Sequence, residues 1–287
     1  MGLSKSVQFS TNDIARYYDV SEDHYVFFWD LNQSHALHYG YWDTNTKSFR
    51  EALANINKLM ADTAGITEGM KVLDAGCGVG GSTMWLAAHK SASVKGITLS
   101  HKQAKRGNEN IALNSLSDKA KLEVQDFTQT SYPSASFDVV WAIESVCHAD
   151  DKNAFLKEAY RLLKPGGKLI LADFFIERDA NPAEQKEIDA WTHGWAVPFF
   201  EKTKTFQSML SDNGFQHTEM KDITQNIVRS AKRLYYAFFP GWVVSKIYNL
   251  FHNSTEFSKK NVYTAYYQYT TLKKGLWKYY VVSAEKR

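Results

Sequence analysis

Short apolar runs alternate with amphipathic stretches between residues 50 and 225. The apolar runs predict buried β-strands at residues 71–74, 93–99, 122–125, 137–143 and 168–174. The stretches between them predict helices over 80–89, 100–114 and 152–163, the second starting at a capping box of Ser100 and Gln103. Lys-Pro-Gly-Gly at 164–167 marks a break before the next strand. Strands and helices alternating at this spacing form βαβ units, so we expect an α/β fold with a parallel sheet.

Two aromatic-rich segments flank this alternating region. One spans residues 17–42, and the other lies within residues 229–287, which hold 15 of the 41 aromatic residues. Eleven Lys and Arg against two Glu give residues 229–287 a formal charge of +9, so the preceding residues carry −6 of the total of +3. Three interpretations stay open for the basic segment: a solvated face, a membrane-surface patch that collects a lipid-like substrate, or a site for an anionic group such as a diphosphate.

Composition narrows the class of protein. A chain of 287 residues with 44% hydrophobic content can bury a substantial core, and a net charge of +3 does not indicate nucleic acid as an obligatory partner. The two cysteines, Cys77 and Cys147, are typical of a reducing compartment rather than a disulfide framework. No run approaches the ~18 apolar residues of a membrane span. We therefore expect a soluble, cytoplasmic protein.

A glycine-rich turn follows the first predicted strand. Residues 72–81 read Val-Leu-Asp-Ala-Gly-Cys-Gly-Val-Gly-Gly, and glycines in such a turn let the backbone approach a ligand closely at a helix N-terminus. Gly76, Gly78 and Gly81 also fit the dinucleotide fingerprint. However, the second strand ends in Gly-Ile-Thr-Leu-Ser at 96–100, without the acid that binds the ribose of a dinucleotide. This argues against a nicotinamide or flavin cofactor.

Five motifs follow one another along the chain: Asp-Ala-Gly-Cys-Gly-Val-Gly at 74–80, Gly-Ile-Thr-Leu-Ser at 96–100, Gln-Asp-Phe at 125–127, Phe-Asp at 137–138 and Leu-Lys-Pro-Gly-Gly at 163–167. In this order they resemble the motifs of class I S-adenosylmethionine-dependent methyltransferases. Ala-Ile-Glu-Ser-Val-Cys-His-Ala at 142–149 is similar to the small-molecule branch that includes sterol and tocopherol methyltransferases. The resemblance covers about residues 50–225.

The resemblance implies a seven-stranded, mostly parallel Rossmann-like sheet in which the last strand, near residues 277–284, runs antiparallel. On this basis we expect an aromatic-rich helical cap over residues 1–50 and a cofactor-binding α/β core over 51–227. A helical lid insertion would cover residues 228–270, and residues 271–287 would supply the final strand of the core sheet.

S-adenosyl-L-methionine is the implied cofactor, and the expected cofactor-binding residues are Asp74, Gly76, Gly78, Gly80, Thr98, Leu99, Gln103, Asp126 and Phe127. The glycines would approach its methionine part, while Asp74 would fix the loop or accept a hydrogen bond from the ammonium group. Asp126 would accept from the adenine amine, and Phe127 would pack on the ring or in the core. The ribose partner stays open between the Thr98 backbone and Gln103. His35 and His38 lie three residues apart, but no third ligand is nearby, so no metal is expected.

The expected catalytic residues are Glu144, His148 and Asp173. His148 follows the fourth strand at the carboxyl edge of the sheet, and an ordinary histidine can accept a proton near neutral pH. The resemblance implies that Asp173 orients its ring. It also implies that Glu144 faces the reacting centre, where it would stabilise a carbocation or remove a proton. Structural roles for these residues, a loop cap and a strand end, are the alternatives.

The predicted function is methyl transfer to a small hydrophobic metabolite of isoprenoid, lipid-like or aromatic character. Aromatic side chains would line its pocket, among them Tyr25, Trp29, Tyr39 and Trp42. C-methylation is favoured, and the alternative is O-methylation of a hydroxylated natural product with His148 as the base. An alternative of another class is a non-catalytic cofactor- or RNA-binding protein. Peripheral membrane contact is a further expectation for the basic aromatic C-terminal region.

Overall fold

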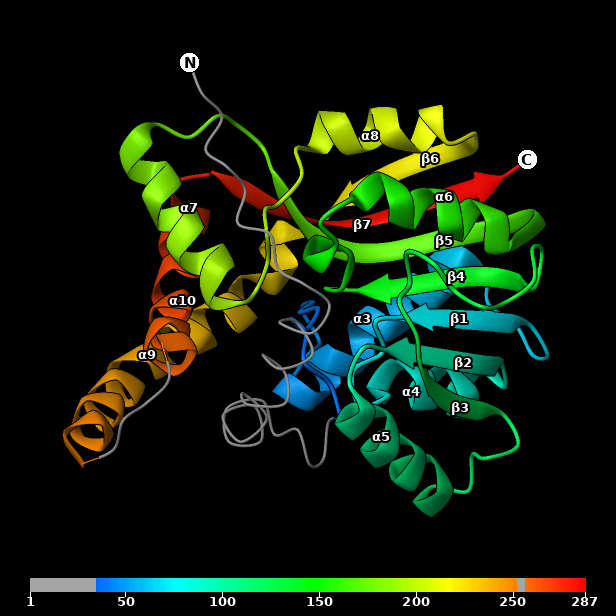
Figure 1. The fold of residues 1–287 in the computed structure, drawn as a ribbon, viewed down its shortest axis with the longest axis horizontal. Helices are drawn as coiled ribbons and strands as arrows, with labels where there is room; N and C mark the ends of the chain where they lie inside the picture. Colours follow the sequence, from blue (N-terminus) through cyan, green and yellow to red (C-terminus); the bar gives the residue numbers. More distant parts are fainter. Residues whose placement is uncertain (1–34, 252–255) are drawn as a thin grey trace.

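The computed structural model describes residues 35–251 and 256–287. Its centre is a seven-stranded sheet with the strand order β3-β2-β1-β4-β5-β7-β6 (Figure 1). Pairing is parallel from β3 to β5, and β7 runs antiparallel to both of its neighbours. The predicted class I methyltransferase sheet, with its antiparallel last strand, is therefore confirmed. The strands are β1 (Lys71–Ala75), β2 (Ser93–Thr98), β3 (Ala120–Val124), β4 (Phe137–Ile143), β5 (Leu163–Ile176), β6 (Phe215–Asp222) and β7 (Trp277–Lys286).

Helices supply the side chains of two hydrophobic clusters that enclose the sheet. One cluster draws on α3 (Phe49–Ala64), α4 (Gly81–Lys90) and α5 (His101–Leu113), and the other on α6 (Lys152–Leu162) and α8 (Thr203–Asp212). Local caps explain where these helices begin. Ser100 Oγ accepts from the Gln103 N–H at 3.1 Å, and Asp151 accepts from the first turn of α6. The cap of α5 was predicted from the sequence.

The Lys-Pro-Gly-Gly segment lies within β5, where the sequence predicted a break before the strand. Pairing with β4 starts at Leu163, opposite Phe137, and resumes at Lys168, opposite Val139. Residues 164–167 therefore bulge out between two paired stretches, and Gly166 adopts a φ of 73° there. The expectation of a strand beginning at Lys168 was wrong because backbone pairing on both sides of the bulge joins the two stretches into one strand.

Three helices form a group at one end of the sheet: α7 (Pro182–Gly194), α9 (Thr224–Phe251) and α10 (Glu256–Lys273). The α9 and α10 helices contact each other and extend away from the sheet (Figure 1). Aromatic packing joins the group to the sheet, since Trp191 of α7 lies 4.9 Å from Trp277 of β7 and 5.5 Å from Phe174 of β5 between ring centroids. Helix α9 begins before residue 228, where the predicted insertion starts, and α10 ends after residue 270, where the predicted insertion ends.

The described part of the N-terminal region is irregular. Residues 35–48 contain neither helix nor strand, so over this stretch the expected helical cap is an extended segment. It is held by main-chain hydrogen bonds, from Tyr41 N to the Ala52 oxygen at 2.9 Å and from Trp42 N to the Asn226 oxygen at 2.8 Å. These bonds place it between α3 and α9. Among the described helices, none combines the length and the apolar character needed to cross a membrane.

Candidate active site

A cavity of about 330 Å³ lies at the carboxyl ends of β1, β2 and β4. Open α/β sheets bind their ligands at this edge, and the volume is within the usual range for small-molecule sites. Four chain segments line it besides the N-terminal segment His35–His38. They are the glycine turn (Asp74, Gly76, Cys77, Gly78, Val79, Gly81, Ser82), the end of β2 with α5 (Thr98, Leu99, Ser100, Gln103), the loop after β3 (Gln125, Asp126, Phe127, Thr128), and the end of β4 with α6 (Ile143, Glu144, Ser145, His148, Ala149, Asp150, Asp151, Ala154).

The glycines of the turn have different surroundings. Gly76 has a φ of 86°, and a Cβ there would lie 2.3 Å from Ser145 Cβ, so this glycine allows β1 and β4 to end close together. Gly78 has a φ of 54°, and a Cβ there would meet no protein atom within 4 Å. Gly80 does not belong to the cavity lining, because it faces Leu122, and Gly81 lines the cavity at the start of α4. The contact predicted between Gly80 and the cofactor stays a prediction.

Asp74 links the glycine turn to α4. Its Oδ2 accepts a hydrogen bond from Thr83 Oγ1 at 2.6 Å, and burial raises the pKa of Asp74 to about 7. The side chain thus fixes the loop, one of the two roles predicted for it. It also lines the cavity. A positive charge in the cavity would favour its ionised form.

The residues predicted for the ribose and the adenine line the same cavity. Thr98 Oγ1 donates to Gln103 Oε1 at 2.6 Å, which leaves the Gln103 amide nitrogen without a partner among the described residues. Asp126 Oδ1 accepts from the N–H and the hydroxyl of Thr128, at 2.8 and 2.7 Å. Phe127 packs edge-on against Phe155, 5.3 Å away between centroids, so it belongs both to the core and to the cavity wall.

Glu144 lies directly after β4 in a backbone conformation that is unusual for a residue with a side chain, with a φ of 47°. Its Oε1 accepts from the Tyr39 N–H at 2.6 Å and from the Tyr279 hydroxyl at 2.7 Å. Burial raises the pKa of Glu144 to about 8 despite these two hydrogen bonds. A carboxyl group that is neutral near pH 7 therefore faces the cavity.

His148 and Asp173 do not form the direct pair that was predicted. The His148 ring lines the cavity, and its Nδ1 lies 3.2 Å from the Ala196 carbonyl oxygen. Asp173 accepts from the main-chain N–H groups of Cys147 and Phe174, at 2.9 Å each. Asp173 thus fixes the turn η1 (Val146–His148), which carries His148, and not the imidazole ring. Burial lowers the pKa of His148 to about 4, so the ring is neutral at pH 7.

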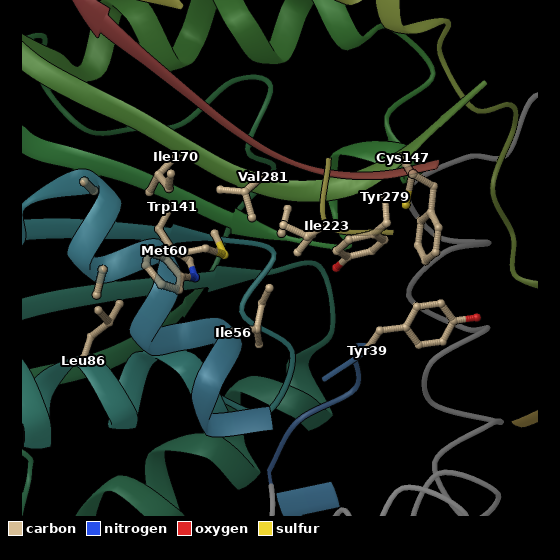
Figure 2. Packing of buried hydrophobic residues seen from close by; sticks show 14 of the residues in the cluster. Tyr39, Ile56, Met60, Leu86, Trp141, Cys147, Ile170, Ile223, Tyr279 and Val281 are labelled. Atoms are coloured by element: carbon tan, nitrogen blue, oxygen red, sulfur yellow. The ribbon is translucent and has the colours of Figure 1, made fainter. Parts of the chain in front are cut away.

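Two of the four aromatic residues predicted for the substrate pocket, Tyr39 and Trp42, fall within the described residues. Tyr39 is fully buried beside Tyr279 (Figure 2), with ring centroids 6.1 Å apart, and its hydroxyl donates to Gln268 at 2.6 Å. The Trp42 indole donates to Ser230 Oγ at 2.9 Å. Neither residue lines the cavity, which corrects the prediction. Tyr25 and Trp29 lie outside the described residues.

His38 lines the cavity, although sequence reasoning did not place it among the cofactor-binding or catalytic residues. It was considered only as a metal ligand, and the signal available was its position beside the aromatic segment Tyr-Gly-Tyr-Trp at 39–42. Its Nε2 is buried and has no hydrogen-bond partner in the part of the chain that the structure describes. Within residues 35–251 and 256–287, no three His, Cys, Asp or Glu side chains lie close enough together to hold a metal ion.

Among the residues that the structure describes, carboxyl groups line the cavity without a basic Lys or Arg. The lining contains five acidic residues: Asp74, Asp126, Glu144, Asp150 and Asp151. A bound cation would favour the ionised forms of Asp74 and Glu144, whose pKa values burial raises. The N-terminus of α4 adds a local positive end that favours a carboxylate. The cavity therefore fits a ligand that combines cationic groups with a carboxylate, and it provides little for a diphosphate.

Comparisons with known proteins agree with this geometry. A family profile described as mycolic acid cyclopropane synthetase matches residues 5–278. The chain is 31% identical over 214 residues to 27-O-demethylrifamycin SV methyltransferase of Amycolatopsis mediterranei, covering 75% of this chain and 77% of the relative. It is 31% identical over 220 residues to cycloartenol-C-24-methyltransferase 1 of Oryza sativa, covering 75% of this chain and 62% of that longer relative.

Among solved structures, a mycolic acid cyclopropane synthase complexed with SAH and CTAB superposes with a TM-score of 0.83. The match covers 98% of this chain and 99% of that one, at 18% sequence identity. At this identity the superposition bears on the fold alone.

Proposed function

The chain belongs to the mycolic acid cyclopropane synthetase family and is an S-adenosylmethionine-dependent methyltransferase, and from this premise we propose that it methylates a small hydrophobic acceptor. The observation that carries the proposal is one cavity that joins the glycine turn to Glu144 and His148. We drop the alternative of a non-catalytic or RNA-binding protein, because the relatives of this chain are methyltransferases. The two free cysteines agree with the reducing, cytoplasmic location expected from the sequence.

The lining residues fit the cofactor. Gly78 leaves open space beside the turn and Gly81 starts α4, so a methionine carboxylate would lie at the helix N-terminus. The acidic lining favours the positive charges of its ammonium and sulfonium groups. Asp126 would accept from the adenine amine, and Gln103 would donate to the ribose through its amide nitrogen. When bound, the cofactor supplies an electrophilic methyl group, and the protein positions the acceptor in line with it.

Methylation at carbon is the reaction that we favour. Attack of an alkene or an electron-rich ring on a methyl group leaves a cation that must then lose a proton. Glu144 is the lining carboxyl group at the end of β4, and its hydrogen bonds from Tyr39 and Tyr279 hold it in one orientation. In its ionised form it would stabilise the cation or accept the proton.

Methylation at oxygen is the second candidate, and His148 is the observation in its favour. Its Nδ1 lies beside a carbonyl oxygen, which only accepts, so Nδ1 carries the proton and Nε2 keeps its lone pair. A neutral imidazole lining the cavity can accept the proton of an acceptor hydroxyl. Both reactions occur among the names of the relatives, since one is an O-demethylrifamycin methyltransferase and another a C-24-methyltransferase.

We propose that two additions to the core close over the acceptor. One is residues 1–50, and the other is residues 228–270, which contain most of helices α9 and α10. Support comes from the segment His35–His38, which lines the cavity and continues into Tyr39. The Tyr39 hydroxyl donates to Gln268 of α10, and Gln268 Nε2 donates to the Ala231 oxygen of α9. Residues 51–227 and 271–287 would then be the core.

We further propose that the α9–α10 pair touches an anionic membrane surface. Tyr235 and Phe238 pack inward against Tyr266, with centroids 5.5 and 5.3 Å apart. The outward aromatic side chains are exposed, Tyr236 by 64% and Phe239 by 49%. Exposed basic residues, Arg229, Lys232 and Arg233, precede them on α9. Aromatic side chains beside basic ones, on helices that extend from the fold (Figure 1), are typical of interfacial contact with acidic lipids.

Cofactor binding is tested by thermal unfolding. S-adenosylmethionine or S-adenosylhomocysteine should raise the Tm, because a ligand that binds only the folded state stabilises it. Gly78→Leu should abolish this shift, since the added side chain would enter the open space beside the turn. The matched control is Gly69→Leu, which imposes the same left-handed strain at a φ of 78°, also in open space, but away from the cavity. An equal shift in both variants, or stabilisation by NAD alone, contradicts the assignment.

Two substitutions separate the reactions on one verified substrate. If the acceptor is a hydroxyl, His148→Ala should lower turnover by roughly 10²- to 10⁴-fold, and Glu144→Gln should matter less. If the acceptor is a carbon atom, Glu144→Gln should be the more damaging, because the cation loses its counter-charge. The cofactor Kd should barely change in either case. Turnover close to that of the wild type in both variants would show that His148 and Glu144 have structural roles only.

The pH profile gives a second readout of the same choice. Burial raises the pKa of Glu144 to about 8, so a reaction that needs the carboxylate should gain rate as pH rises from 6 to 8. Burial lowers the pKa of His148 to about 4, so a reaction that needs neutral imidazole should be nearly independent of pH over that range.

Membrane contact is tested by flotation with vesicles of phosphatidylcholine, with and without phosphatidylglycerol. The wild type should float with the anionic vesicles and be released in part by high salt. A variant combining Tyr236→Ser, Phe239→Ser and Trp242→Ser should not float. Leu113→Ser, at a residue of α5 that is 83% exposed, is the control and should float normally. Flotation of the triple variant contradicts the proposal. So does a wild-type dimer, seen by light scattering, that the triple variant no longer forms.

A further inference from the structure

His38 lines the cavity and carries a buried ring nitrogen that has no hydrogen-bond partner among the described residues. Its Nδ1 lies 3.0 Å from the Tyr39 carbonyl oxygen, and a carbonyl only accepts, so the proton is on Nδ1 and the lone pair is on Nε2. Nε2 is buried and has no partner among residues 35–251 and 256–287, and the residue lines the cavity while being only 5% exposed. Trp141 and Trp191 each contain a buried indole nitrogen without a partner among the described residues. These nitrogens are N–H donors, and neither residue lines the cavity.

The backbone around His38 is fixed, so the ring cannot readily turn toward another partner. The Tyr39 N–H donates to Glu144, and the Gly40 N–H donates to Ser230 Oγ at 3.1 Å. A Cβ on Gly40 would lie 2.6 Å from Ala52 Cβ, which shows how closely the segment lies on α3. Buried acceptors in folded proteins normally have a donor, so an unpaired nitrogen in a cavity lining is a candidate contact for a bound molecule.

We propose that His38 Nε2 accepts a hydrogen bond from a hydroxyl group of the methyl acceptor. The inference rests on the proposed function and names the acceptor more closely, as a hydroxylated molecule with an apolar body. His38 is joined through the next residue to Glu144, at the part of the cavity that also contains His148. The ammonium group of the cofactor offers similar donor chemistry, and the experiment below separates the two sources.

The contact favours one acceptor class over another. A neutral imidazole that accepts this hydrogen bond polarises the O–H bond, which raises the electron density on the oxygen. In a phenol, it also raises the density on the ring carbons ortho and para to that oxygen. His38 would therefore promote methylation at either atom, without removing the proton itself. A plain alkene leaves Nε2 without its donor, which disfavours its binding.

The test uses two probes that differ by one hydroxyl group, para-nonylphenol and nonylbenzene, titrated calorimetrically into protein saturated with S-adenosylhomocysteine. The wild type should prefer the phenol by about tenfold. His38→Phe keeps a ring but removes the acceptor atom, so it should abolish the preference and leave the nonylbenzene Kd unchanged. His38→Gln places an amide oxygen within reach of the phenol hydroxyl and should retain part of the preference for the phenol. His89→Phe, on α4 and outside the cavity lining, is the control.

The Kd for S-adenosylhomocysteine distinguishes the remaining outcomes and shows that each variant is folded. It should stay within about twofold in His38→Phe, because the proposed donor is on the acceptor. A weaker Kd together with an intact phenol preference assigns the donor to the cofactor and overturns the proposal. A wild-type complex with no preference, including one that binds neither probe, also overturns it. A wild type that does not bind S-adenosylhomocysteine contradicts the proposed function itself.

Discussion

The half-buried carboxyl group of Glu144 joins three parts of the chain at the edge of the sheet. It extends from the end of β4, receives the N–H of Tyr39 from the N-terminal segment, and receives the hydroxyl of Tyr279 from β7. Burial raises its pKa to about 8, so near pH 7 the group makes these bonds without the cost of a buried charge. Its left-handed backbone, with a φ of 47°, is the kind of local strain that surrounding contacts must hold in place.

The cavity and the projecting helices share this support. Tyr39 extends the hydrogen bonds from Glu144 to Gln268 of α10, and Gln268 extends them to α9. The residue before Tyr39 is His38, so the bond that fixes the segment also places an imidazole in the cavity wall. An acceptor delivered along α9 and α10 would thus meet a site whose wall is tied to the same helices. The proposed binding of the acceptor and the proposed contact with a lipid surface would then be physically linked.

The sequence was sufficient where the signals are local. Strand periodicity and the cap of α5 predicted the parallel βαβ units, and the glycine turn marked the edge of the sheet that forms the cavity. The seven strands and the antiparallel last strand were implied by the resemblance to class I methyltransferases. The sequence was insufficient where distant residues decide the outcome. Tyr39 was assigned to the pocket because it is aromatic, but bonds to two other elements hold it in the core, and the residue before it, His38, lines the cavity instead. Asp173 was paired with the His148 ring, although the nearest donors are main-chain groups, among them that of Cys147.

Amide hydrogen exchange of the Tyr39 N–H tests the central claim most directly, because that group donates to Glu144. Glu144→Ala removes the acceptor and should accelerate exchange at residues 36–42 by at least about tenfold, while α8 exchanges as in the wild type. Glu144→Gln keeps a carbonyl oxygen at the same place and should protect the segment nearly as well. Unchanged exchange at Tyr39 in Glu144→Ala would show that other contacts hold the segment, and would contradict the account.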